Sequence, residues 1–236
     1  MKKFDESLFN EKFKKINRKN TYGPGIRRKY LPNFIKLGDF SNDKDFIHLC
    51  LDTFEKVKNV NHIESDEYYP ISKGCPLVKW FPSTYQQILL QTFVGDKDKE
   101  GQIEENYNVI IEDYKEIHNY IKKYLPIKYC RARFAILYPG YELDWHIDSC
   151  TSVSCRVHFV IKGPSKWSVY RNKVLEEKEL NTGEIWFTNA GYPHRVVNDT
   201  NEERIVILLG TSSDELVKVN EEFRIIKENL EKNKDQ

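Results

Sequence analysis

The stretch CRARFAILYPGYELDWHID, residues 130–148, carries the clearest structural pattern in the chain. Its first eight residues are rich in apolar side chains, Pro139-Gly140 marks a turn, and the remainder predicts a second strand. Side chains two positions apart in a strand point to the same face, so His146 and Asp148 project together. Two strongly hydrated side chains on one strand face need partners or water. The pair is therefore the first candidate for a functional site, with a hydrogen-bonded surface pair as the simpler interpretation.

The rest of the second half shows the same pattern of short strands and turns. Short segments rich in β-branched and aromatic residues follow one another, with Gly, Pro or Asn-Asp-Thr-Asn between them and no helical pattern. Seven such segments predict a β-sandwich or barrel over residues 128–212. They are CRARFAIL, YELDWHID, SCRVHFVIKG, KWSVYRN, EIWFTN, PHRVVN and RIVILLGT.

Residues 1–127 are expected to be mainly helical and to support the barrel. Apolar residues at helical spacing predict one helix over residues 4–16, a second after Ser41-Asn42-Asp43, and a third from about Tyr107 to Leu125. Residues 213–236 are expected to form one C-terminal amphipathic helix. The predicted class is α+β, in three parts: 1–127, 128–212 and 213–236. The apolar positions are Phe4, Leu8, Phe9, Phe13, Ile16; Phe46, Leu49, Cys50, Phe54, Val57; Ile110, Ile111, Tyr114, Ile117, Ile121, Tyr124; and Leu216, Val219, Phe223, Ile226, Leu230.

Composition narrows the class of protein. The 236 residues are 39% hydrophobic and 31% charged with a net charge of +1, which gives no general reason to expect nucleic acid or a membrane as partner. No signal-like or membrane-spanning apolar run is present, and five cysteines without CxxC spacing indicate reduced thiols. A cytoplasmic protein is expected. One local exception is Lys12–Lys29, where eight Lys or Arg meet no acid; this is either a solvated basic face or a patch that steers an acidic substrate.

Four further residues extend the candidate site. His194 opens a later strand and, with His146 and Asp148, supplies two imidazoles and one carboxylate, a set that suits a divalent first-row metal. Arg204 lies at the start of RIVILLG, a strand apolar enough to be buried on both faces, so its guanidinium needs an anion or a route to water. An ion pair with the neighbouring glutamates, Glu202 or Glu203, would meet that need. Arg156 and His158 share one strand face. A rival triplet, His62-Ile-Glu64, lies in a polar run that predicts a loop.

These residues, in this order, resemble the aspartyl/asparaginyl β-hydroxylase family. The pattern is His146-x-Asp148, then Arg156-x-His158, then GEIWF, then His194 and Arg204, over about residues 130–210. The family comprises Fe(II)- and 2-oxoglutarate-dependent oxygenases and includes proline hydroxylases. The resemblance implies a double-stranded β-helix (a jelly-roll, cupin-like barrel) in the second half.

The resemblance also implies roles. His146, Asp148 and His194 would hold Fe(II), and Arg204 would bind the distal carboxylate of 2-oxoglutarate as a bidentate pair. Arg156 or His158 would contact the cosubstrate or the substrate. O2 and 2-oxoglutarate would be consumed, ascorbate would assist, and an unactivated C–H would be hydroxylated with release of succinate and CO2.

The substrate stays open at this point. A free amino acid, proline-like, and an Asp, Asn or Pro residue of a protein are both expected candidates. Some protein-directed members lack the carboxylate ligand, so Asp148 favours the small-molecule branch. A nucleobase oxygenase that uses Lys12–Lys29 is one alternative, and a non-redox cupin-like metal module is another. Nearby residues are expected to serve mainly in packing: Arg133, Tyr138, Trp145, Cys150, Cys155, Trp186 and Phe187.

Overall fold

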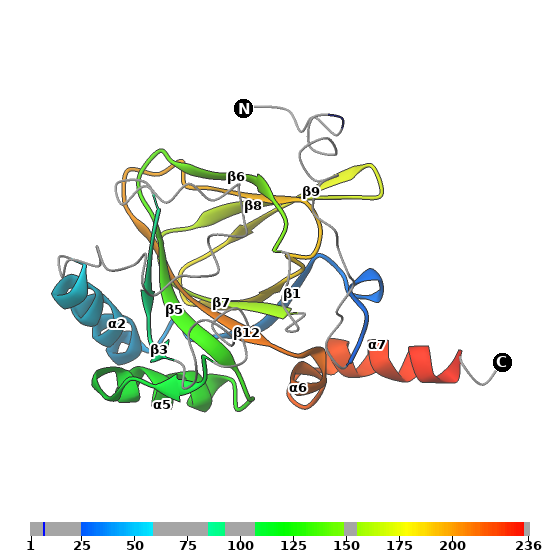
Figure 1. Cartoon of the computed structure of the whole chain (residues 1–236), viewed down its shortest axis with the longest axis horizontal. Coiled ribbons are helices and arrows are strands. Elements are labelled where there is room, and N and C mark those ends of the chain that lie inside the picture. The colour runs from blue at the N-terminus through cyan, green and yellow to red at the C-terminus, as the bar shows by residue number, and fades with distance from the viewer. Residues whose placement is uncertain (1–6, 8–24, 59–84, 93–106, 149–154, 234–236) are drawn as a thin grey trace, which may run out of the picture.

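The computed structural model describes residues 7, 25–58, 85–92, 107–148 and 155–233 (Figure 1). The expected helix over residues 4–16 and the triplet His62-Ile-Glu64 lie outside these residues. The described part is mostly antiparallel β-sheet with few helices. The helices are α2 (Lys44–Val57), α5 (Lys115–Tyr124), α6 (Ser213–Val217), α7 (Glu221–Lys232) and two short 3-10 turns, η1 (Arg28–Tyr30) and η5 (Glu112–Tyr114).

Two sheets contain nearly all of the strands. The six-stranded sheet has the order β1-β10-β7-β12-β5-β2, and the four-stranded sheet has the order β6-β11-β8-β9. Every neighbouring pair is antiparallel. The strands are β1 (Phe34–Asp39), β2 (Tyr85–Leu89), β5 (Cys130–Leu137), β6 (Glu142–His146), β7 (Cys155–Lys162), β8 (Ser165–Arg171), β9 (Val174–Leu180), β10 (Glu184–Thr188), β11 (His194–Val197) and β12 (Arg204–Thr211), with a separate pair β3 (Gln91–Thr92) and β4 (Val109–Ile110).

The chain passes back and forth between the two sheets. Strands β5, β7, β10 and β12 belong to the six-stranded sheet, and the intervening strands β6, β8, β9 and β11 belong to the four-stranded one. In Figure 1 the sheet that holds β6, β8 and β9 lies over the sheet that holds β5, β7 and β12, and helices α2 and α5 lie on the opposite side of the latter. This arrangement is compatible with a jelly roll.

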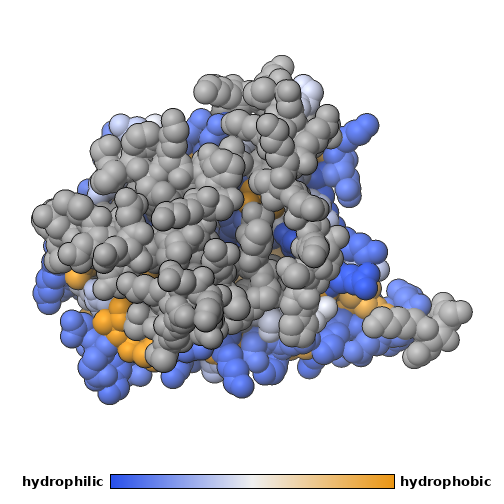
Figure 2. All heavy atoms as spheres, in the orientation of Figure 1, coloured by the Kyte–Doolittle hydropathy of each residue, from blue (hydrophilic) through white to orange (hydrophobic). Residues whose placement is uncertain are grey.

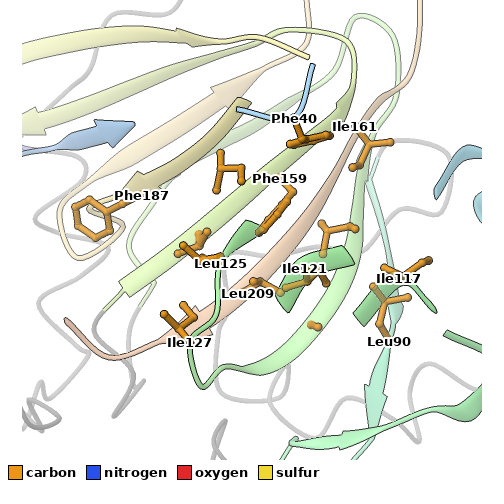
Figure 3. Packing of buried hydrophobic residues seen from close by; sticks show 14 of the residues in the cluster. Phe40, Leu90, Ile117, Ile121, Leu125, Ile127, Phe159, Ile161, Phe187 and Leu209 are labelled. Carbon is orange, nitrogen blue, oxygen red and sulfur yellow. The ribbon is translucent and has the colours of Figure 1, made fainter. Parts of the chain in front are cut away.

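The central strands of the six-stranded sheet, β5, β7 and β12, are buried on both faces. The outer face of the sheet forms one apolar cluster with α2 and α5, which includes Phe46, Ile121 and Phe159. Figure 3 shows Ile121 and Phe159 within this cluster. The inner face of the sheet forms a second cluster with the four-stranded sheet, which includes Val160, Trp167 and Val206. Because side chains alternate along a strand, Phe159 and Val160 serve different clusters. Strand β12 is buried at every position, as the apolar run RIVILLG predicts.

Several element boundaries differ from the sequence-based expectation. The helix after residues 41–43 is confirmed, with Asp43 accepting the backbone N–H of Phe46 as its N-cap. The third helix begins only at Lys115, because β4 and η5 occupy the residues before it. The C-terminal helix is split into α6 and α7, and Asn220 caps the second of them. Strands β1 and β2 come from the half expected to be mainly helical, and β9 was not predicted.

Where described residues are visible in Figure 2, most are hydrophilic, and the apolar patches among them are small. Of the helices in the described ranges, none combines the length and the apolar character required to cross a bilayer.

Candidate metal centre

The structure brings His146, Asp148 and His194 together at one end of the four-stranded sheet. Strand β6 ends at His146, Asp148 follows two residues later, and β11 begins at His194, which pairs directly with His146 in the ladder. One potential ligand atom from each residue lies within 4.8 Å of the other two. Nε2 of His146 is 3.8 Å from Oδ1 of Asp148, and Nε2 of His194 is 4.0 Å from the same oxygen.

Backbone carbonyls fix the protonation pattern of both histidines. Nδ1 of His146 lies 2.6 Å from the carbonyl oxygen of Asp144, and Nδ1 of His194 lies 2.9 Å from that of Tyr192. A carbonyl oxygen can only accept, so each Nδ1 carries the hydrogen. In each ring the other nitrogen, Nε2, faces Asp148. This is the arrangement in which an outer hydrogen bond orients a metal-binding imidazole.

Asp148 is held in place from two sides. Its backbone N–H donates to the carbonyl of Ala190 at 3.0 Å, and its Oδ2 accepts from Nε of Arg156 at 2.8 Å. Burial alone would raise the pKa of Asp148, but attraction to Arg156, and then to the two histidines, lowers that pKa well below its ordinary range. The carboxylate is ionised, and Oδ1 is left facing the two imidazole nitrogens.

His194 is the more deeply buried of the two imidazoles, at 1% exposed. Burial, followed by repulsion from His146, lowers the pKa of His194 to about 3. Its ring is thus neutral at physiological pH, which is the form that binds metals. Two imidazole nitrogens and one anionic oxygen facing one point can hold a divalent cation.

Arg156 and His158 lie side by side on the inner face of β7. Their register partners on β12 are Gly210 and Leu208. Nε2 of His158 lies 2.9 Å from Oγ1 of Thr188 on β10. Burial is the main cause that lowers the pKa of His158 well below its ordinary value, and the next is the positive charge of Arg204. Arg204 shares a face of β12 with Val206 and Leu208, which belong to the inner cluster, so it lies on the same face of the sheet as His158.

Arg204 is buried at the start of β12, with 2% of its surface exposed. The nearby glutamates, Glu202 and Glu203, form ion pairs with Lys162 instead, at 3.5 and 3.0 Å. The simple interpretation of Arg204 as a surface ion pair is therefore wrong. Its guanidinium belongs to the interior between the sheets.

The sequence alone does not show whether Arg133 belongs to the site. Arg133 is 3% exposed and pairs with Leu208 on β12, which puts it on the inner face of the six-stranded sheet, and its charge also acts on His158. The alternation of side chains along CRARFAIL is a signal for this position, because Arg133 shares a strand face with Ala135 and Leu137.

The remaining flanking residues behave mostly as packing residues. Tyr138 and Phe187 join the outer cluster, Cys155 is fully buried there, and Trp186 lies in the inner cluster with its Nε1–H donated to Glu184 at 2.9 Å. Trp145 is half-buried, with the Arg195 guanidinium 5.5 Å from its ring centre. Cys150 lies outside the described residues.

Part of the basic stretch lies at the rim of this centre. The side-chain amide of Asn189 donates to the carbonyls of Arg28, Leu31 and Pro32, so the segment 28–33 lies against the loop that leads into His194. The Arg28 side chain occupies the space that a Cβ on Gly191 would need. Arg27 to Lys29 therefore lie near the loop that carries His194, and residues 12–24 are outside the described ranges.

Comparison with solved structures gives distant similarities. The TT1209 protein of Thermus thermophilus is 23% identical, with 34% of this chain and 70% of that chain covered and a TM-score of 0.28. Oxalate decarboxylase of Bacillus subtilis is 14% identical, with 34% of this chain and 21% of that chain covered and a TM-score of 0.29. None of the curated proteins compared with the chain matches it.

The sequence comparison with protein families is more informative. The model of the aspartyl/asparaginyl beta-hydroxylase family matches residues 84–212, which is more than half of the 236 residues. The matched segment runs from the start of β2 to the end of β12 and contains all three residues of the candidate metal centre together with Arg156, His158 and Arg204. The chain belongs to the aspartyl/asparaginyl β-hydroxylase family.

Proposed function

We propose that this protein is an Fe(II)- and 2-oxoglutarate-dependent hydroxylase. The observation that carries the proposal is the convergence of Nε2 of His146, Nε2 of His194 and Oδ1 of Asp148, with both imidazole tautomers fixed from behind. Two imidazoles and one carboxylate are the ligand set of non-haem iron oxygenases, and on one face of the metal they leave positions for other ligands. Membership of a hydroxylase family supports the same reaction class.

The residues present fit such a metal. Asp148 supplies one negative charge and the buried His194 is a neutral donor, so the carboxylate offsets half of the charge of a divalent ion. Bound iron would supply the oxygen activation needed to attack an unactivated C–H. The contribution of the chain is orientation: Asp144 and Tyr192 carbonyls hold the imidazoles, and Arg156 holds the carboxylate.

Arg204 is the proposed anchor of the cosubstrate. A buried guanidinium forms a bidentate, charge-assisted pair with a carboxylate, and the distal end of 2-oxoglutarate is such a group. His158 and Arg156 lie on the strand next to β12 and are proposed to contact the cosubstrate or the substrate. The bond from Arg156 to Asp148 gives it a second role, in holding the metal ligand.

The fold supports the proposal at a coarser level. We propose that β5 to β12 form a double-stranded β-helix, because the eight strands are divided between two antiparallel sheets and place the three candidate ligands at one end. Residues 128–212 would then be the catalytic core, with residues 1–127 and 213–236 as supporting parts. The proposed substrate is an amino acid, free and proline-like or within a protein.

The test is turnover by the purified full-length chain. With Fe(II), ascorbate and 2-oxoglutarate, succinate should form, and its rate should rise when the right substrate is added from a panel of free amino acids, peptides and nucleosides, the last because Arg27 to Lys29 lie near the His194 loop. Hydroxylation is read as a mass gain of one oxygen. His146→Ala and Asp148→Ala should abolish succinate formation, whereas the exposed His48→Ala should not change it. Unchanged turnover in both site variants would refute the assignment.

The cosubstrate anchor has its own test. Arg204→Lys keeps the charge but cannot form the bidentate pair, and we expect the KM for 2-oxoglutarate to rise at least about 10-fold, the factor expected for one lost charge-assisted hydrogen bond. If only the KM of the amino-acid substrate changed, Arg204 would bind that substrate and not 2-oxoglutarate. A metal-bound protein that makes no succinate with any substrate would instead favour a non-redox cupin-like module.

A further inference from the structure

Trp167 connects the metal centre with the interior of the barrel. It lies on β8, is 4% exposed, and belongs to the apolar cluster between the two sheets. Its ring stacks on His194, with centroids 5.2 Å apart and planes 10° apart. The same ring makes a T-shaped contact with His158, with centroids 4.8 Å apart and planes 69° apart. One indole therefore contacts a proposed metal ligand from the four-stranded sheet and a polar residue from the six-stranded sheet.

The indole N–H of Trp167 is a buried donor for which the described residues offer no acceptor. Nδ1 of His158 is also buried and has no hydrogen-bond partner among the described residues. The other tryptophan of this cluster, Trp186, donates its indole N–H to Glu184 at 2.9 Å. A buried donor left without an acceptor costs about 1–3 kcal/mol, and most such groups in folded proteins are satisfied. Trp167 thus points to an acceptor that none of the described residues supplies, which a bound ligand can provide.

The position of Trp167 indicates which ligand supplies that acceptor. A ligand that binds the metal beside His194 and also reaches the guanidinium of Arg204 extends past His158. Trp167 contacts both His158 and His194, so its ring lies beside this ligand. The indole N–H can donate but cannot accept, so it suits an oxygen that carries negative charge. A dicarboxylate that spans this interior offers such oxygens.

We infer that Trp167 is a positioning residue whose Nε1–H donates to a carboxylate oxygen of the cosubstrate bound between the metal centre and Arg204. The inference rests on the proposed function, because it takes the cosubstrate to be 2-oxoglutarate. By stacking on His194 while it binds the cosubstrate, Trp167 fixes a metal ligand and the cosubstrate relative to each other. Its neighbour on the same strand face, Val169, carries no donor and cannot do this.

The indole N–H signals test the inference without any turnover. The chain has four tryptophans, and each gives one indole resonance in a ¹H–¹⁵N spectrum of the Zn(II)-loaded protein. On addition of 2-oxoglutarate we expect the Trp167 indole proton to move downfield and that of Trp186 to stay in place. The Trp167 signal is assigned by its loss in Trp167→Phe or, if that variant does not fold, by the loss of the other signals in Trp80→Phe, Trp145→Phe and Trp186→Phe. A Trp167 signal that does not respond to bound 2-oxoglutarate overturns the inference.

Calorimetry of 2-oxoglutarate binding to the Zn(II)-loaded protein supplies the second readout. Trp167→Phe should weaken binding about 10-fold or more, as for the loss of one hydrogen bond to a charged group, while Trp186→Phe should stay within about twofold of the wild type. Zn(II) binding should persist in both variants. Equal affinities in the two variants would leave the proposed function standing and remove the role of Trp167. A wild-type protein that binds Zn(II) but not 2-oxoglutarate would overturn both.

Discussion

His118 shows what a structural histidine looks like in this protein, by contrast with those of the metal centre. It is fully buried on α5, its Nε2 donates to the carbonyl of Leu90 at 3.0 Å, and its Nδ1 accepts from the hydroxyl of Tyr129 at 2.7 Å. Both ring nitrogens are thus used. In His146 and His194 only Nδ1 is used, and Nε2 faces Asp148. The free nitrogen, rather than burial, distinguishes the two kinds of histidine.

His118 should make stability depend on pH. Burial, and then the charge of Lys122, lowers its pKa, although the bond to Leu90 opposes this. The unfolded chain therefore takes up a proton near the ordinary value of about 6.5 before the folded protein does. The free energy of unfolding should fall as the pH drops from about 7 to about 5.

The matched variant is His118→Gln, which lacks the titrating group. Urea unfolding at several pH values should show a smaller decrease over this window in the variant than in the wild type, even though the variant is less stable at pH 7. An equal decrease in both proteins would mean that His118 does not contribute.

At the residue level, the sequence singled out the three side chains that the structure brings together, but not their surroundings. His-x-Asp, the later His194 and the Arg at +10 follow from spacing and residue type, because metal and anion sites require these side chains. The tautomers could not be predicted, since they depend on carbonyls of Asp144 and Tyr192 that only the folded backbone aims at the rings. Trp167 looks from the sequence like any buried strand residue.

At the scale of elements, the turn before β10 depends on Gly183. Its φ is +87°, its N–H donates to Val160 at 2.8 Å, and its carbonyl accepts from Phe40 at 2.6 Å. A Cβ at this position would lie 2.5 Å from Cα of Ser41. The turn thus connects three segments that are distant in sequence, and only glycine fits it.

Gly183→Ala should destabilise the protein by at least about 1–3 kcal/mol, from the left-handed backbone and from the overlap with Ser41. The measurement is urea unfolding. Gly140→Ala is the matched control, because φ at Gly140 is also positive, at +76°, but nothing lies within 4 Å of its added Cβ. If the two variants lose the same stability, contact with Ser41 is not the cause of the larger cost.

The elements that the sequence missed have a physical explanation. Strand β9, VLEEKEL, is at the edge of its sheet and exposed at six of its seven positions, so it lacks the apolar alternation of a half-buried strand. Strands β1 and β2 are also edge strands, contributed by a half with helical patterns on either side. The apolar spacing of Ile110 and Ile111 predicts an earlier start for the third helix. In the structure the residues before Lys115 form β4 and η5 instead.

At the scale of the whole molecule, the six-stranded sheet separates two regions with different tasks. Its outer face packs on α2 and on the segment before it through aromatic contacts, with the Phe159 ring 6.3 Å from Phe46 on α2 and 5.8 Å from Phe40. Its inner face carries the polar residues of the site. The family pattern in residues 130–210 describes the inner face, whereas the helical layer that stabilises it comes from outside that range.

Phe159→Ala should therefore reduce stability without removing the metal site. We expect a loss of about 3–5 kcal/mol in the free energy of unfolding, typical of a buried phenylalanine. Metal affinity at a temperature where the variant is folded should be unchanged, because Arg156 and His158 face the other way. Val174→Ala, 63% exposed on β9, should change stability by less than about 0.5 kcal/mol. A Phe159→Ala variant as stable as the wild type would contradict the packing described for the outer face.

The most direct test of the central claim is the stoichiometry of Fe(II) binding under anaerobic conditions. We predict one Fe(II) per wild-type chain and per His48→Ala chain, and loss of that binding in His146→Ala, Asp148→Ala and His194→Ala variants that remain folded by circular dichroism. Wild-type protein that binds no iron, or site variants that bind it as the wild type does, would contradict the claim that these three side chains hold the metal.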